Sequence, residues 1–322
     1  MRRKEIGQAS LLYNKLVIVC KMKKILAIDG GGIKGVYAAS LLAEIEKHSD
    51  GNICDYFDML AGTSTGAIIA AALSIKIPAH DILELYLNKG EKIFPKEHWK
   101  LFRGKYKTQP LKNELKKIFD DKKMSDASTR LLIPTYNLST DAVQIFKTPH
   151  AMDLYFDKDT KIYDVLLATT AAPAYFSPYR MSGGVYMDGG VGANNPSLIA
   201  LVEGITRCDW NKEDIMILNI GSVSGGKNTT GKEKMGLSNF LTIQQCFMNA
   251  ENQYASNICN LIIGDRYIRI GETVKSGEVA LDKVDKISLK KLCDLGVNSA
   301  KRNYNMIKNR FLSEMKEQLM FY

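Results

Sequence analysis

The chain is poor in the residues that usually hold metal ions. Its 322 residues include only four histidines, and none follows His150. The six cysteines are scattered, and no two form a C-x-x-C pair. A structural zinc site is therefore not expected, and we predict neither a metal nor a cofactor. Widely spaced cysteines of this kind are typical of reduced thiols in a cytoplasmic protein.

The sequence also lacks a long apolar run. The stretch "LVIVC" at 16–20 is only five residues long before lysines resume, which is too short for a secretory signal or a membrane span. Residues 1–22 are expected to form an N-terminal extension outside the core. We predict a cytoplasmic protein whose contact with membranes is peripheral.

Positive charge is in excess and is unevenly distributed. Lysine and arginine number 44 against 35 acidic residues, a net charge of +9, which favours anionic partners such as nucleic acid or a negatively charged membrane surface. Residues 89–123 hold a large share of the excess, and aromatic residues are interleaved with the lysines: Phe94, Trp99, Phe102, Tyr106 and Phe119. This stretch is either a membrane-docking face or a solvated, lysine-rich helical face.

Short β-prone runs alternate with helical spacing along the chain. "KILAID" and "YFDMLAG" each lead through a glycine turn into an amphipathic or apolar helix. This order predicts an α/β fold with a mostly parallel sheet, helices on both faces and a helical C-terminal region. A core over 23–207 and a remainder over 208–322 are expected to form one domain. Further predicted elements are strands at "RLLIPTYN", "AVQIFK", "GGVYMD", "DIMILNIGS" and "RYIRI", a helix ended by Pro173, and a terminal helix from Leu289 to Gln318.

The first glycine turn is "DGGGIKG" at 29–35. Successive amides at such a turn, leading into a helix, stabilise an anion. Gly30, Gly32 and Gly35 also match G-x-G-x-x-G, so a dinucleotide site is a less favoured alternative. That site needs an acidic residue at the end of the second strand, whereas Asp50 falls in a polar loop.

The second turn, "LAGTSTG" at 60–66, fits the nucleophile elbow G-x-S-x-G. Gly62 and Gly66 are explained sterically, because a strained turn that lifts Ser64 above a sheet tolerates only small neighbours. A serine hydroxyl needs a base. Since no histidine follows residue 150, the chain order serine, acid, histidine cannot be built, and His48, His80 and His98 are expected at the surface.

The third turn, "MDGGVGANNP" at 187–196, offers another base. Asp188 closes a predicted strand, so we expect it on the same edge of a parallel sheet as Ser64. A carboxylate hydrogen-bonded to the serine can accept its proton. Gly189 and Gly190 let the backbone turn sharply and leave room for substrate. The plain alternative is a β-turn aspartate.

These three motifs, in this order, together with "ATTAAPAYFSPY" at 168–179, resemble the patatin-like phospholipase family. The resemblance covers 24–207 and implies a three-layer fold that carries a serine-aspartate dyad. It implies that Ser64 is the nucleophile and Asp188 the base of a lipid acyl hydrolase without metal or histidine. It further implies an oxyanion hole at the first turn, whose matching positions are Gly30, Gly31, Gly32 and Lys34. One departure is "NIGS" at 219–222, where relatives often have a glycine-threonine-glycine turn.

The resemblance also suggests partners. A phospholipid or lysophospholipid would be the substrate, met at a peripheral membrane surface, and no nucleic acid polymer is expected. Some bacterial members are phospholipases switched on by cyclic nucleotides in antiphage defence. The length of this chain and its helical C-terminal region are compatible with that group, so a cyclic-nucleotide activator is the alternative we retain.

Overall fold

The computed structural model describes residues 21–93, 105–225, 240–275, 284–319 and 321. Within these ranges no helix combines the length and the apolar character that a membrane crossing requires. Residues 1–20 of the predicted extension at 1–22 lie outside the described residues.

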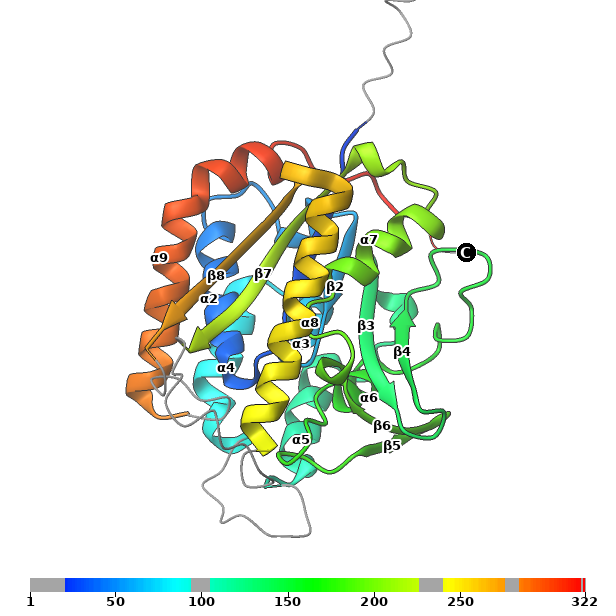
Figure 1. Ribbon diagram of the computed structural model, residues 1–322, viewed down its shortest axis with the longest axis vertical. Coiled ribbons are helices and arrows are strands. Elements are labelled where there is room, and N and C mark those ends of the chain that lie inside the picture. The colour runs from blue at the N-terminus through cyan, green and yellow to red at the C-terminus, as the bar shows by residue number, and fades with distance from the viewer. Residues whose placement is uncertain (1–20, 94–104, 226–239, 276–283, 320, 322) are drawn as a thin grey trace, which may run out of the picture.

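A single eight-stranded sheet forms the centre of the molecule (Figure 1). Its order is β5-β6-β3-β2-β1-β7-β8, and β4 also pairs with β3. The strands β1, β2, β3, β7 and β8 run parallel, whereas β4, β5 and β6 form antiparallel pairs. The strands are β1 (Lys23–Ile28), β2 (Met59–Gly62), β3 (Arg130–Asn137), β4 (Ala142–Lys147), β5 (Tyr179–Met181), β6 (Gly184–Asp188), β7 (Ile215–Gly225) and β8 (Tyr267–Val274).

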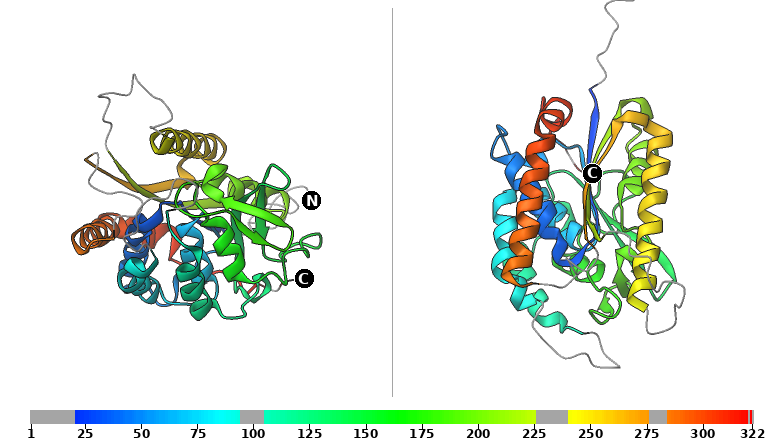
Figure 2. Two further views of the ribbon diagram at one scale, coloured as in Figure 1. Left: turned by 90° about the horizontal axis from the view of Figure 1, so that it is seen from below. Right: turned by 60° about the vertical axis from the view of Figure 1, so that its left-hand side comes forward.

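Helices cover both faces of this sheet, which gives the three layers. Figure 2 shows α9 and α8 on opposite sides of the strands. One layer contains α2 (Gly35–Glu46), α3 (Thr65–Ser74), α4 (Ala79–Ile93), α5 (Thr108–Phe119), α6 (Ile162–Thr169) and α9 (Lys286–Phe311). The other contains α7 (Ser197–Thr206) and α8 (Phe240–Ile263).

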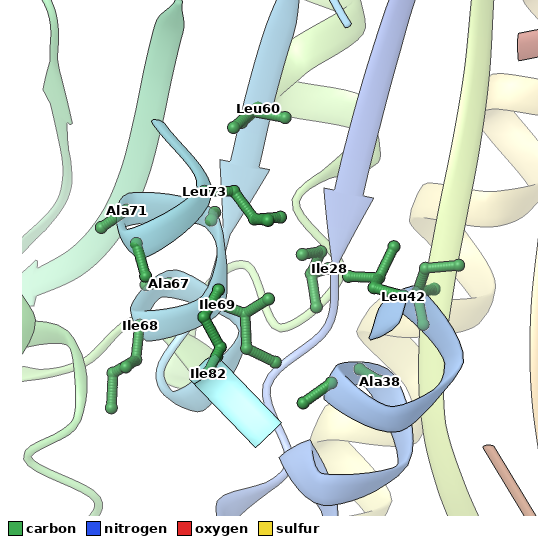
Figure 3. Close-up of a cluster of buried hydrophobic side chains, with 14 of the residues drawn as sticks. Ile28, Ala38, Leu42, Leu60, Ala67, Ile68, Ile69, Ala71, Leu73 and Ile82 are labelled. Carbon is green, nitrogen blue, oxygen red and sulfur yellow. The ribbon is translucent and has the colours of Figure 1, made fainter. Parts of the chain in front are cut away.

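The strands are buried on both faces because their apolar side chains alternate between two cores. Ile28 of β1 and Leu60 of β2 join the core beneath α2 and α3, where Figure 3 shows them beside Leu42 and Leu73. Ala27 of β1, by contrast, joins the core beneath α7 and α8. The near-continuous apolar composition of "KILAI" follows from this double burial.

The region after residue 207 completes the same sheet and both helical layers. Strand β7 pairs with β1, and β8 pairs with β7. The end of the chain returns to the start of the sheet, where Lys24 Nζ donates a hydrogen bond to the Phe311 carbonyl at 2.9 Å. The Lys316 amide donates to the Asp55 carbonyl at 2.7 Å.

Strands β2 and β6 meet end to end on one edge of β3. Strand β2 pairs in parallel with the first residues of β3, Arg130–Leu132, while β6 pairs antiparallel with its last residues, Thr135–Asn137. Strand β4 occupies the opposite edge. The C-terminal ends of β2 and β6 therefore face each other. The prediction that Asp188 closes a parallel strand is wrong; an antiparallel strand brings it to the level of Ser64 from the opposite direction, because β3 extends beyond the end of β2.

The basic stretch is partly described. Phe94, Trp99 and Phe102 lie outside the described residues. Tyr106 and Phe119 are buried, so they belong to the core and not to a docking face. Helix α5 is amphipathic, and its lysines lie largely toward solvent. For this segment the structure favours the solvated, lysine-rich face over the membrane-docking face.

Two predicted helix ends were too late in the sequence. Helix α6 stops at Thr169, four residues before Pro173, so the proline does not end it directly, because it restricts only Ala172. Helix α9 stops at Phe311, whose buried ring stacks on Phe57 at 5.9 Å between centroids.

Candidate active site

Ser64 stands on a strained turn between β2 and α3. Its backbone has φ 54° and ψ −121°, in the left-handed region that side chains disfavour. A Cβ atom on Gly62 would lie 2.4 Å from the Gly66 carbonyl oxygen, and one on Gly66 would lie 2.3 Å from that of Ile28. Neither position can hold a side chain. The Ser64 amide donates to Thr169 Oγ1 at 3.1 Å, which fixes the turn from the side of α6.

Asp188 ends β6 directly beside this serine. Ser64 Oγ donates a hydrogen bond of 2.6 Å to Asp188 Oδ2, and the Gly190 amide donates one of 2.7 Å to Oδ1. Burial raises the pKa of the carboxyl group to about 6, although both hydrogen bonds act to lower it. The group is thus mainly a carboxylate at neutral pH, in direct contact with the hydroxyl whose proton it would accept.

Two amides of the glycine turn after β1 lie at a cavity that also contains Ser64 and Asp188, here called the catalytic cavity. Gly31 and Gly32 line it together with Ser64 and Asp188, and Gly32 has a φ of 58° that favours glycine. Among the described residues, neither of these two amides has a hydrogen-bond acceptor. The Gly30 amide differs, since it donates to the Asn194 carbonyl at 3.1 Å and is not available to a substrate.

Lys34 has a structural contact and does not line the catalytic cavity. Its side chain is 8% exposed, and Nζ donates to the Val223 carbonyl of β7 at 2.9 Å. Burial lowers the pKa of this amine. The cation therefore ties the glycine turn to β7.

An ion pair between a buried carboxylate and a partly exposed arginine lies next to the glycine turn. Asp29, at the end of β1, accepts from Arg269 Nη2 of β8 at 2.6 Å and from Asn219 Nδ2 of β7 at 2.9 Å. The Asp29 side chain is fully buried. Sequence reasoning missed Arg269 and Asn219, because they come from strands beyond the matched motifs. The signal available was a polar residue, Asn219, within the otherwise apolar strand "IMILNIG".

The catalytic cavity is small and mostly apolar. Its volume is about 70 Å³, well below the roughly 300–1,000 Å³ of typical small-molecule sites. Apolar and aromatic side chains form most of its wall: Ile33, Ile68, Tyr86, Leu111, Phe176 and Val191. Such a wall suits part of an acyl chain.

Asn194 is a second residue that sequence reasoning missed. Its side chain is buried beside the dyad, and Nδ2 donates to Asn252 Oδ1 of α8 at 3.0 Å. Its Oδ1 has no hydrogen-bond partner in the described part of the chain. The motif "GANNP" that follows Asp188 was the signal in the sequence.

The alternatives to a serine-aspartate pair lose support from the geometry. His48 and His80 are exposed, as predicted, and His98 is not described. His150 is buried between Thr148 and Glu203, with its ring nitrogens 2.9 Å and 3.1 Å from their oxygens. No described histidine is hydrogen-bonded to Ser64 or Asp188.

The dinucleotide alternative also loses support. Asp50 is exposed and lies beyond the C-terminal end of α2, whereas the glycine turn of Gly30, Gly32 and Gly35 lies at the N-terminal end of that helix. The two are therefore separated by the length of the helix. A single nucleotide therefore could not place its ribose at Asp50 and its phosphate at the glycine turn.

Comparison with known proteins agrees with this geometry. A family model described as patatin-like phospholipase matches residues 26–201. A cGAMP-activated phospholipase of Escherichia coli is 36% identical over 62% of each chain, so less than two thirds of that relative is matched. A cGAMP-activated phospholipase of Pseudomonas aeruginosa is 32% identical over 86% of this chain and 88% of its own.

A solved structure, VipD from Legionella pneumophila, has a TM-score of 0.53 at 13% identity, covering 89% of this chain and 67% of that one. At this identity the likeness concerns the fold alone. The family model covers more than half of the chain, and the chain belongs to the patatin-like phospholipase family.

Proposed function

We propose that this chain is a lipid acyl hydrolase that cleaves carboxylic esters of phospholipids or lysophospholipids. The observation that supports it most directly is the 2.6 Å hydrogen bond from Ser64 Oγ to Asp188 Oδ2. The elbow that presents Ser64 is strained, and the cavity around the pair is lined by apolar side chains. Nucleophile, base and acyl-binding wall thus occur together.

In the first step, Ser64 Oγ attacks the ester carbonyl carbon while Asp188 Oδ2 accepts the hydroxyl proton. The tetrahedral intermediate carries its negative charge on the former carbonyl oxygen. The amides of Gly31 and Gly32 would donate to that oxygen, and one such donor is worth about 3 kcal/mol of transition-state stabilisation. Collapse expels the lysolipid or alcohol, which takes the proton from Asp188.

In the second step, water cleaves the acyl-enzyme. Asp188 accepts a proton from the water as its oxygen attacks the Ser64 ester, and the same two amides stabilise the second oxyanion. Collapse returns the proton to Ser64 Oγ and releases the fatty acid. No group outside the dyad and the glycine turn is needed for either proton transfer.

A lipid substrate requires a change in the site. The cavity of about 70 Å³ does not hold a fatty acyl chain, so its apolar wall must move when the substrate enters. We propose that this happens at a membrane surface on the cytoplasmic side, where an apolar interface can replace the contacts that the wall loses.

Activation by a cyclic dinucleotide is a second proposal, which adds regulation to catalysis. Relatives from two bacteria bear the description cGAMP-activated phospholipase, one of them matched over most of both chains. The small cavity is one that an activator could enlarge. A chain regulated in this way would degrade membranes in antiphage defence only when the nucleotide is present.

The test is product release from vesicles of mixed phospholipids, with and without cGAMP, followed by mass spectrometry. The unmodified chain should release fatty acids, and the accompanying lysolipids identify the ester bond attacked. Ser64→Ala and Asp188→Asn should not release them. Ser313→Ala is the matched control, because Ser313 is exposed and remote from the dyad. Fatty-acid release by Ser64→Ala at the rate of the unmodified chain would refute the proposal.

A further inference from the structure

A second, much larger cleft lies beside the catalytic cavity. It has a volume of about 610 Å³ and lies between α8 and the C-terminal ends of β7 and β8. Figure 1 shows α8 beside these two strands. The volume falls within the range of about 300–1,000 Å³ that small-molecule sites occupy.

The wall of this cleft is built mainly from uncharged hydrogen-bonding groups. Its carboxamide side chains come from α8 and from the segment after Asp188: Asn194, Gln245, Asn249, Asn252, Gln253 and Asn257. Each presents a donor and an acceptor in one plane, which is the arrangement that pairs with the edge of a nucleobase. Among the described lining residues, the charged ones are Lys34, Arg269 and Glu272, which sum to one positive charge.

The cleft and the catalytic cavity share a wall. Gly31, Asn194 and Met248 line both of them. Gly31 supplies one of the proposed oxyanion amides, and the Asn194 carbonyl holds the preceding residue, Gly30, at 3.1 Å. Any group that changes the position of Asn194 from the cleft side therefore acts on the turn that stabilises the transition state.

Two buried oxygens at this wall lack hydrogen-bond partners within the described part of the chain. They are Asn194 Oδ1 and Ser222 Oγ, from residues that both line the cleft. They lie close to the glycine turn, since a Cβ on Gly30 would be 2.5 Å from Asn194 Oδ1 and one on Gly31 would be 2.5 Å from Ser222 Oγ. Buried acceptors without a donor are costly, so a ligand that donates to them gains affinity.

We infer that this cleft is a nucleotide site, and that its occupant controls the catalytic cavity through Gly31, Asn194 and Met248. The amide row would read the base, Arg269 would face the phosphate, and a donor on the ligand would reach Asn194 Oδ1. The control of catalysis rests on the acyl-hydrolase function proposed above, whereas the binding of the nucleotide does not.

The coupling has a direct physical origin. A ligand shifts an equilibrium only as far as it binds one state more tightly than the other. A hydrogen bond to Asn194 Oδ1 would depend on the position of this side chain, which is tied to Gly30 through its carbonyl and to α8 through Asn252. The ligand therefore favours the conformation in which Asn194 Oδ1 accepts its hydrogen bond. Because Asn194 is bonded to Gly30, that conformation also fixes the position of Gly31.

The experiment measures binding by calorimetry with cGAMP, AMP and inorganic phosphate as probes. The variant Gln253→Ala/Asn257→Ala removes two carboxamides from the cleft. Its matched control is Asn260→Ala on the same helix, because Asn260 is exposed and does not line the cleft. Asn257→Trp is a second variant, which fills the cleft. Thermal melting checks that all three fold.

We expect at least one nucleotide to bind to the unmodified chain. The double variant should weaken that binding at least about tenfold, as the loss of two neutral hydrogen bonds implies, and Asn257→Trp should abolish it. Asn260→Ala should bind like the unmodified chain. Binding of phosphate alone, no binding of any probe, or equal affinity in the double variant and the control would each overturn the inference.

Control of the catalytic cavity is measured by the rate at which a fluorophosphonate labels Ser64. The nucleotide that binds should change this rate in the unmodified chain and in Asn260→Ala but not in Asn257→Trp. An unchanged rate despite binding would overturn the coupling. Fatty-acid release without nucleotide binding would refute the nucleotide site and support the proposed hydrolase. Nucleotide binding without any fatty-acid release would support the nucleotide site and refute the hydrolase.

Discussion

The catalytic cavity and the cleft behind it differ in size and in chemistry, although they share a wall. The cavity is about 70 Å³ and mostly apolar, while the cleft is about 610 Å³ and lined by carboxamides. The cavity holds Ser64 Oγ and Asp188 Oδ2 at 2.6 Å, whereas Asn194 Oδ1 and Ser222 Oγ, at the wall of the cleft, have no hydrogen-bond partner among the described residues. In the proposed function, reaction and recognition therefore take place in separate spaces, and Gly31 of the glycine turn lines both.

The largest effect that separates the two spaces is expected from Asp188→Asn. The substitution removes the base but keeps the side-chain shape, so turnover should fall by about ten-thousand-fold, as it does when a triad loses its carboxylate. Nucleotide binding to the cleft should not change. The measurements are hydrolysis of a soluble ester and calorimetry on the same preparation. A variant that loses both together would show that the cavity and the cleft are one site.

The next effect concerns the ion pair between Asp29 and Arg269, next to the glycine turn that the cavity and the cleft share. Asp29→Asn leaves Arg269 without its buried carboxylate partner. Breaking a pair of this kind costs about 3 kcal/mol of the free energy of unfolding. The control is Asp265→Asn, because Asp265 is 91% exposed and its contact with Arg310 lies at the surface, where such pairs contribute about 0–1 kcal/mol. Urea unfolding measures the free energy of unfolding of both variants. Equal decreases in the two variants would contradict a stabilising role for the pair between Asp29 and Arg269.

A smaller effect should follow from one methyl group added at the Ser64 elbow, compared with one added on β8 at the wall of the cleft. On Gly66 the new Cβ would lie 2.3 Å from the Ile28 carbonyl oxygen, whereas on Gly271 of β8 its closest neighbour would be 3.6 Å away. Gly66→Ala should lower the free energy of unfolding by about 1–3 kcal/mol or more through overpacking. Gly271→Ala should change it by less than about 1 kcal/mol. Thermal and urea unfolding measure both, and a tolerated Gly66→Ala would show that the elbow is not tight.

The smallest effect is a dependence on pH that belongs to the cavity alone. The proposed base, Asp188, would be active as a carboxylate, and burial raises its pKa to about 6. The value of kcat/KM should therefore be flat above this pH and fall about tenfold for each pH unit well below it. A soluble short-chain ester over pH 4.5–8 gives the profile. A plateau that extends to pH 4.5 would mean that Asp188 does not act as the base.

The local geometry around Ser64 could be predicted from the sequence. "LAGTSTG" indicated an elbow with obligatory glycines, and the geometry gives Ser64 a φ of 54° with no room at Gly62 or Gly66. These features depend on a few neighbouring residues, which is why a short motif carries them. The absence of a histidine after residue 150 led to Asp188, which contacts Ser64.

The parts that depend on distant pairing were not predictable from motifs. Nothing in "GGVYMD" shows that β6 runs antiparallel to β3, since the direction of a strand is set by its partner and not by its own composition. Arg269 and Asn219 were missed for the same reason, because their role comes from pairing among β1, β7 and β8. The carboxamide row of α8 indicated only a helix, until the fold placed it opposite these strands.

The end-to-end meeting of β2 and β6 has a consequence for synthesis on the ribosome. Ser64 leaves the ribosome 124 residues ahead of Asp188, to which it is hydrogen-bonded, and Asp29 precedes its partner Arg269 by 240 residues. In a nascent chain Ser64 therefore lacks its hydrogen bond to Asp188 until β6 pairs with β3, and Asp29 lacks its ion pair with Arg269 until β8 joins the sheet. On the proposed mechanism, a nascent chain, or one terminated before Asp188, would therefore release no fatty acid.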